Sequence, residues 1–246
     1  MMNKYKLANL TREDVENRIK EGAIAILPIG ATEQHGPHLP MGTDFYLAEF
    51  LATKVAEKIN GIILPTIPFG YSWVWQSLPG TVSIKHRTLE LFISDVIESA
   101  KRSGYQMLVI INGHESNTTT LKYVVRDYAE NSDFPVYYFF YPEFDEVRTK
   151  YCESKTWFGM IHACEFETSL MLASNPELVH PEKATLEYPP YSYEYKHASR
   201  ELGEISKSGI FGDATLASSE KGDGMLNDFA QNIVTAIEAL RKDFRS

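Results

Sequence analysis

The sequence predicts an α/β fold, a three-layer α/β/α sandwich around a mainly parallel sheet. Four short runs are rich in apolar residues, which is typical of strands covered on both faces. Longer segments with apolar residues at helical spacing lie between and after these runs. Strands that alternate with helices of about ten or more residues form βαβ units, which place parallel strands in one sheet under two layers of helices.

The strands follow from the apolar runs and from the residues beside them. The first run (AIAILPI) lies between two glycines, as a buried strand does, and the third (QMLVII) is the clearest of the set. The second contains Pro65, which favours an edge or a strand end. We predict strands at residues 23–29, 62–67, 106–111 and 136–140.

The helices follow from apolar residues three and four positions apart. Thr43 is a suitable N-cap for the first, and Gly104 closes the second. Residues 188–195 (YPPYSYEY) are predicted not to be helical, and to form a surface loop or subunit contact, with a pocket wall as the alternative. We predict helices at residues 43–59, 88–103, 117–130, 166–173 and 228–242.

Bulk properties indicate one globular domain over residues 1–246, with 43% hydrophobic and 23% charged residues. A net charge of −9 and the lack of a basic cluster argue against a nucleic-acid partner. No apolar run approaches the roughly 18 residues of a membrane span, and no signal-like segment is visible, so we expect a cytoplasmic protein. Cys152 and Cys164 lack metal-site spacing and are expected to be free thiols.

Imidazoles and carboxylates follow two of the predicted strands. Glu33, His35 and Asp44 come after the first strand, and His114 follows the third. Ligands bind at the carboxyl ends of parallel strands, so these side chains are expected at one edge of the sheet. Imidazole and carboxylate are suitable ligands for zinc, manganese or iron. An aspartate at a helix start could bridge two cations while Glu33 and His35 take one each.

Each of these residues alone has a simpler interpretation. Asp44 could be a helix cap, and His114 an ordinary hydrogen-bonded loop histidine. Their joint placement, beside glycines that allow close backbone approach, favours a metal site. His38 is a weaker candidate, with an indirect or surface role as the alternative.

A third segment, residues 161–169, carries His162 with carboxylates nearby and leads into an apolar helix. His162 is a candidate general acid or base. If the helix already includes His162, Glu165 shares its face better than Glu167 does.

Together these pieces resemble the creatininase (creatinine amidohydrolase) family. Five blocks occur in the family's order over nearly the whole chain, and the first alone is quite specific. The blocks are Glu33-x-His35-Gly-x-His38-Leu-Pro-x-Gly-Thr43-Asp44, Pro79-Gly80-Thr81, Asn112-Gly113-His114-x-x-Asn117, His162-Ala-x-x-x-Glu167-Thr168-Ser169 and Gly212-Asp213-Ala-Thr.

The resemblance implies a creatininase-like three-layer hydrolase fold with a dinuclear metal centre, assembled as a hexamer of the trimer-of-dimers kind. It implies that Glu33 and His114 bind one metal, His35 the other, and that Asp44 bridges them. It also implies that His162 handles protons during catalysis.

Three positions depart from the family's pattern. Ser116 stands where creatininase has a glutamate that binds the second metal, and Cys164 replaces a glycine. Near Ser72, Val74 and Trp75 stand where many members have Glu-His.

A further carboxylate is therefore expected at the second metal, from Glu115, Glu165 or Glu167. We favour Glu167, which belongs to a shared block and could reach the metal if the helix begins only after Cys164.

We predict a metal-dependent hydrolase that cleaves a C–N bond in a small amide, cyclic amides included, with two divalent ions per chain (zinc, manganese or both, with iron as a further option). His162 and Glu167 are the predicted catalytic residues. The alternatives are a hydrolase of a cyclic keto-sugar, cyclitol or lactone, and a non-catalytic metal-stabilised subunit.

The expected partners are a small-molecule substrate and further copies of the chain, with no membrane. The predicted substrate-binding residues are Ser72, Trp73, Trp75, Trp157 and Phe158.

Overall fold

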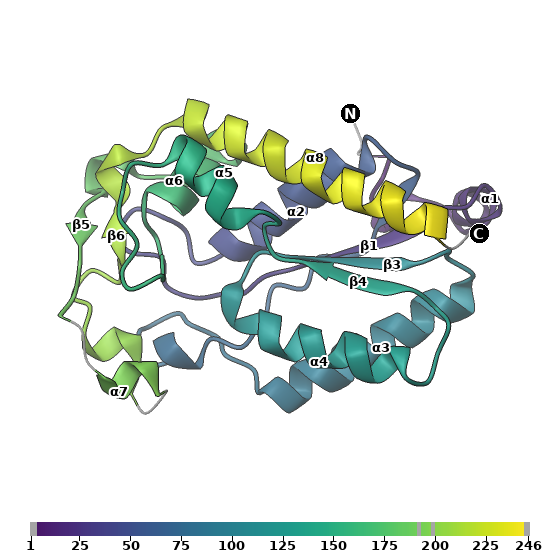
Figure 1. The fold of residues 1–246 in the computed structure, drawn as a ribbon, viewed down its shortest axis with the longest axis horizontal. Helices are drawn as coiled ribbons and strands as arrows, with labels where there is room; N and C mark the ends of the chain where they lie inside the picture. Colours follow the sequence, from purple (N-terminus) through teal and green to yellow (C-terminus); the bar gives the residue numbers. More distant parts are fainter. Residues whose placement is uncertain (1–3, 191–192, 198–199, 244–246) are drawn as a thin grey trace.

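The computed structural model describes residues 4–190, 193–197 and 200–243. A parallel sheet of four strands lies at its centre in the order β2-β1-β3-β4 (Figure 1). The strands are β1 (Ile24–Ile29), β2 (Gly61–Ile63), β3 (Leu108–Asn112) and β4 (Val136–Phe139). This arrangement agrees with the α/β fold expected from the sequence.

Helices cover both faces of the sheet, so the molecule has three layers (Figure 1). On one face lie α2 (Thr43–Ala56) and α8 (Ser219–Asp243), and on the other α3 (His86–Ser103) and α4 (Thr118–Ala129). The remaining helices are α1 (Arg12–Lys20), α5 (Phe144–Tyr151), α6 (Glu165–Ser174) and the short α7 (Tyr193–Lys196).

Alternation along the strands divides the core in two. Ile24 and Ile26 pack into the cluster with α2, α6 and α8, while Ala25 and Leu27 pack into the cluster with α3 and α4. All six residues of β1 are buried, because both of its faces are covered.

A second, antiparallel pair lies at one end of the molecule, at the left of Figure 1. It consists of β5 (Leu186–Glu187) and β6 (Gly212–Asp213). Phe211, the residue directly before β6, forms an antiparallel bridge with His162. This end of the molecule therefore also holds His162 in place.

Most element boundaries agree with the sequence predictions within a few residues, with four differences. β2 ends at Ile63, two residues before Pro65. α8 begins at Ser219, nine residues earlier than expected, and α1, α5, β5 and β6 were not predicted. Within the segment predicted to be non-helical, α7 covers Tyr193–Lys196, while residues 191 and 192 lie outside the described part.

Across the described ranges, no helix combines the length and the apolar composition that a membrane crossing needs.

Candidate metal centre

The carboxyl ends of β1 and β3 meet the first turn of α2. Glu33 and His35 lie in the loop after β1, His114 follows β3, and Asp44 is the second residue of α2. Two glycines allow this close approach. A Cβ at Gly113 would lie 2.2 Å from the carbonyl oxygen of Asp44. A Cβ at Gly30 would lie 2.3 Å from the backbone nitrogen of Phe45, the next residue of α2. The sequence-predicted ligands therefore converge because two loops carry no side chain where the helix crosses them.

Glu33, Asp44 and His114 form one group of potential ligands. His114 Nδ1 lies 3.0 Å from Asp44 Oδ2, and His114 Nε2 lies 3.5 Å from Glu33 Oε2. His114 Nε2 is also 2.9 Å from the carbonyl oxygen of Tyr71. When Nε2 donates its proton there, the lone pair of Nδ1 is left on the side of Asp44.

His35, Asp44 and Glu167 form a second group. His35 Nε2 lies 3.1 Å from Asp44 Oδ1 and 3.9 Å from Glu167 Oε1. His35 Nδ1 is 3.1 Å from the carbonyl oxygen of Glu33, so donation to that oxygen leaves Nε2 free as a ligand. Asp44 belongs to both groups and turns one oxygen to each.

Burial and mutual repulsion disturb the titration of these side chains. Burial raises the pKa of Glu33, and it raises that of Glu167 to about 7 against the opposing influence of His35. Burial alone would lower the pKa values of His35 and His114, but the neighbouring carboxylates outweigh it and raise both to about 10. Among the described residues, the imidazoles are the positive partners of Glu33, Asp44 and Glu167, and bound cations would supply further positive charge.

The donor set fits divalent cations. Glu33 Oε2 and Asp44 Oδ2 are buried. Although nitrogens of His114 lie 3.5 and 3.0 Å from them, neither oxygen accepts a hydrogen bond of normal geometry from a described residue. Buried carboxylate oxygens are normally bonded, so two unpaired ones in one cluster call for a ligand. Buried oxygen and imidazole donors that converge in this way are suited to zinc or manganese.

His162 forms a third group of potential ligands, with Glu33 and His35 and without Asp44. Its Nδ1 is 3.7 Å from Glu33 Oε1, and its Nε2 is 2.8 Å from the carbonyl oxygen of Gln34. Its ring stacks on Trp75, with centroids 4.4 Å apart. Burial and then the charge of His35 lower its pKa well below the usual value, which keeps the imidazole neutral.

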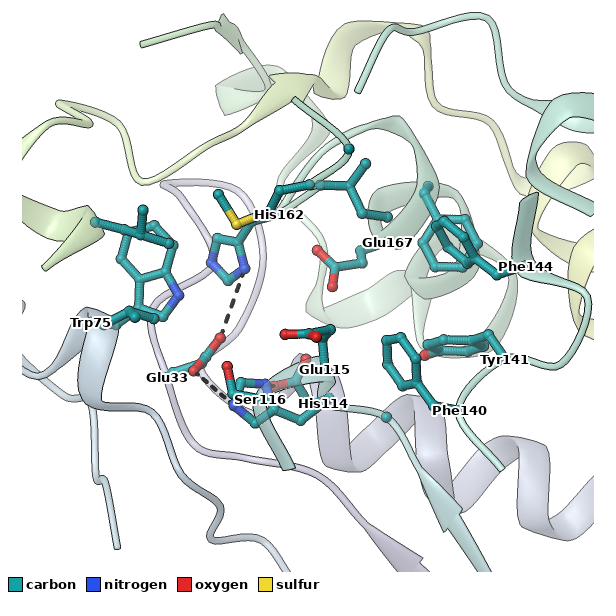
Figure 2. Close-up of a pocket in the computed structure, with 18 of the residues that line it drawn as sticks. Glu33, Trp75, His114, Glu115, Ser116, Phe140, Tyr141, Phe144, His162 and Glu167 are labelled. Atoms are coloured by element: carbon teal, nitrogen blue, oxygen red, sulfur yellow. Dashed lines mark ion pairs between the residues drawn. The ribbon is translucent and has the colours of Figure 1, made fainter. Parts of the chain in front are cut away.

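A pocket of about 470 Å³ opens onto the cluster (Figure 2). Of the five predicted substrate-binding residues, Trp75 and Phe158 line it. Ser72, Trp73 and Trp157 are not in the lining. Ser72 is buried behind His114, 3.5 Å from its Nε2, and Trp157 packs on Phe211 with its indole N–H donated to the carbonyl oxygen of Pro189.

Three carboxylates are candidates to replace the metal-binding glutamate that the family has at the position of Ser116, and their surroundings differ. Glu167 lies in the second ligand group, and Glu115 lines the pocket but joins none of the groups. Glu165 is fully buried and accepts hydrogen bonds from Glu153 N, Ser154 N and Lys221 Nζ, so it is bonded within the protein. His38 is buried too, 2.8 Å from Thr168 Oγ1, and belongs to none of the ligand groups.

Sequence reasoning missed the aromatic wall formed by Phe140, Tyr141 and Phe144 (Figure 2). Tyr141 comes two residues after the end of β4, so its position after a strand was a signal that could have found it. Gln34 was also missed, although it lies between two predicted ligands. Its Nε2 is 2.9 Å from His162 Nε2 and donates to the carbonyl oxygen of Gly209.

Comparison with known proteins gives one family. The family model described as creatinine amidohydrolase matches residues 8–237. The chain is 31% identical to the creatinine amidohydrolase of Pseudomonas putida, over 97% of this chain and 96% of that protein. It is 28% identical to the 3-dehydro-scyllo-inosose hydrolase of Thermotoga maritima, covering 93% and 82%, and 30% identical to a mycofactocin precursor peptide peptidase of Mycobacterium ulcerans, covering 86% and 83%.

Solved structures agree with the sequence matches. A mutant creatininase of the Zn-Zn type superimposes with a TM-score of 0.81 at 30% identity, covering 96% of this chain and 97% of that one. A creatininase with manganese gives a TM-score of 0.78 at 30% identity, covering 96% and 98%. The similarity therefore extends over the whole fold and includes a Zn-Zn creatininase and a manganese creatininase.

Proposed function

The chain belongs to the creatininase (creatinine amidohydrolase) family of hydrolases, and from this premise we propose that it cleaves a C–N bond in a small amide at a dinuclear metal centre. The observation that carries the proposal is the sharing of Asp44 between two groups of potential ligands. Two adjacent sites joined by one carboxylate are the arrangement that binds a pair of cations.

In this proposal Glu33, Asp44 and His114 hold one ion, and His35, Asp44 and Glu167 hold the other. The unpaired oxygens Glu33 Oε2 and Asp44 Oδ2 support it, since both are buried. Divalent ions, zinc or manganese with iron as a third option, supply an activated water and a Lewis acid for the carbonyl oxygen when bound.

His162 is placed to move protons. With Nε2–H donated to the Gln34 carbonyl oxygen, Nδ1 keeps its lone pair on the side of Glu33. Because its pKa is lowered, the neutral imidazole can take a proton at Nδ1 from the attacking water and deliver it to the leaving nitrogen.

The pocket favours a small, flat substrate without a phosphate. Trp75, Phe158 and Phe144 supply apolar walls. The lining includes the carboxylates of Glu115 and Glu167 but, among the residues that the structure describes, no Lys or Arg. An anionic phosphoryl group would therefore meet only like charge beyond the metals. Ser72, Trp73 and Trp157 are proposed to act from behind this wall, by positioning His114 and the aromatic side chains.

A second candidate is hydrolysis of a cyclic keto-sugar or cyclitol, because one relative is a 3-dehydro-scyllo-inosose hydrolase. The same centre would serve it, since a ketone carbonyl presents the same kind of oxygen. The two candidates differ in the bond that breaks, so only products separate them.

The test is a substrate panel on protein reconstituted with zinc or manganese. Creatinine, formamides, short peptides and keto-inositols are incubated with the wild type and with Asp44→Ala, and products are followed by mass spectrometry. We expect turnover of an amide by the wild type alone, with close to two divalent ions per chain by elemental analysis. Turnover only of keto-inositols would select the second candidate, and a stable metal content near zero would overturn both.

A further inference from the structure

Tyr141 carries a polar group that neither the metal ligands nor the proposed proton transfers use. Its side chain is 3% exposed, yet its hydroxyl has no hydrogen-bond partner among the described residues. Buried tyrosine hydroxyls usually have one. The residue lines the pocket, and Figure 2 shows its hydroxyl end turned toward the side of the cavity that holds Glu115.

The position of the ring is fixed by the surrounding aromatic side chains. It packs edge-on against Phe166, with centroids 5.2 Å apart, and contacts Phe229 and Phe140 at 5.0 Å each. A ring held on three sides cannot readily swing its hydroxyl to another partner. The direction of the O–H group is therefore set by packing, before any ligand arrives.

The backbone around Tyr141 is also unusual. Tyr141 has φ +38° and Glu143 has φ +59°, in the left-handed region that residues other than glycine rarely adopt. Such conformations persist where the surrounding structure imposes them, and they cluster at functional sites. The turn after β4 thus directs Tyr141 into the pocket at some conformational expense.

The hydroxyl remains protonated at neutral pH. Burial and the negative charges of Glu167 and Asp44 raise its pKa well above the usual value. It is therefore a neutral donor close to the metal-ligand cluster, and the described residues offer it no acceptor.

We propose that the Tyr141 hydroxyl donates a hydrogen bond to the acyl oxygen of the substrate and stabilises that oxygen as negative charge develops on it. The proton stays on the tyrosine throughout, so the step requires no further reactant. The inference rests on the proposed function, because it assumes a substrate with a carbonyl oxygen, and it adds a catalytic residue outside the ligand set and His162.

Tyr141→Phe removes only the hydroxyl and is the test variant. Since that hydroxyl has no hydrogen-bond partner among the residues that the structure describes, we expect an unchanged or higher melting temperature and a normal metal content. Turnover of the amide found by the substrate panel should fall by roughly 10², the effect of losing one oxyanion donor, with a smaller change in KM. The matched control is Tyr128→Phe, which removes another buried hydroxyl, outside this pocket, that also has no hydrogen-bond partner within the described ranges.

A binding measurement keeps the test independent of turnover. Benzamide, a flat neutral amide, is titrated into the zinc-loaded protein by calorimetry, and we expect about three- to tenfold weaker binding in Tyr141→Phe but not in Tyr128→Phe. Unchanged amide turnover in Tyr141→Phe would overturn the inference. If no amide is turned over, unchanged benzamide affinity in this variant would overturn it. So would loss of metal or failure to fold, because either would assign the hydroxyl a structural role. If the wild type turns over no amide, the proposed function fails, and the benzamide titration still decides the role of Tyr141.

Discussion

At the scale of single residues, Asp44 has the largest predicted influence on the metal centre. One oxygen faces His35 at 3.1 Å and the other faces His114 at 3.0 Å. Burial alone would raise its pKa, but these two imidazoles lower it well below the usual value, so the carboxylate is ionised and ready to bind cations.

Asp44→Ala should therefore lose both ions, whereas His35→Ala should lose mainly one. The measurement is zinc content by elemental analysis after dialysis against a fixed free-zinc concentration. If Asp44→Ala kept its full zinc content, Asp44 would not be a ligand. It would then contribute only a favourable interaction with the helix dipole of α2, worth about 0.5 kcal/mol of stability.

Glu167→Gln should lower the affinity of one site by at least about tenfold and leave the other site intact. The reason is that Glu167 belongs only to the group that it forms with His35 and Asp44. Zinc titration into the apo variant would show two separated binding phases. Glu115→Gln is the control, since Glu115 lines the same pocket outside the ligand groups. A weakened site in the control with normal binding in Glu167→Gln would move the ligand to Glu115.

His162→Ala should lower kcat by roughly 10²–10⁴, the range for a general acid–base group, with a near-normal metal content. The control is His180→Ala, because the His180 side chain is 57% exposed and pairs with Glu182 instead. Loss of metal together with activity would make His162 a ligand, which its place beside Glu33 and His35 also permits.

At the scale of elements, the start of α6 decides which glutamate reaches the metals. α6 begins at Glu165 with Cys164 as its N-cap, so His162 lies outside the helix. A helical face shared by His162 and Glu165 therefore does not exist. Glu165 instead accepts two backbone N–H groups of the segment after α5 and the ammonium group of Lys221 on α8.

Lys221→Met should destabilise the packing of α6 on α8. The variant leaves the buried carboxylate of Glu165 without its cation. For a fully buried pair, such a loss lowers the free energy of unfolding by about 3–5 kcal/mol. Here we expect about 2–3 kcal/mol, because the Lys221 side chain is 22% exposed. Urea unfolding would measure the loss. Lys150→Met, which breaks an exposed pair between α5 and Asp228 on α8, should change stability little. Equal effects of the two variants would contradict the special role of the Glu165 pair.

At the scale of the whole molecule, the family suggests assembly into a hexamer, and this remains a prediction. Light scattering coupled to gel filtration should give a mass near six times the 27.9 kDa of one chain. A mass near 27.9 kDa at micromolar concentration would contradict it.

Sequence patterns alone predict the layered α/β fold and the gathering of four side chains at the carboxyl edge of the sheet. Both depend on local patterns: apolar runs predict buried strands, and polar residues directly after a strand must lie at its end. For the same reason the sequence could propose Glu33, His35, Asp44 and His114 as ligands, and the shared blocks added Glu167 and His162 to the proposal.

Which of the other candidate residues lie together depends on long-range packing and is visible only in the folded molecule. The aromatic residues show this, since Trp75 and Phe158 line the pocket while Trp157 turns to Phe211. Short elements such as α5 and β6 also escaped prediction, because their stability comes from packing and not from their own periodicity. Whether a tyrosine hydroxyl such as that of Tyr141 has a partner depends on residues far away in the chain, and no local pattern encodes those contacts.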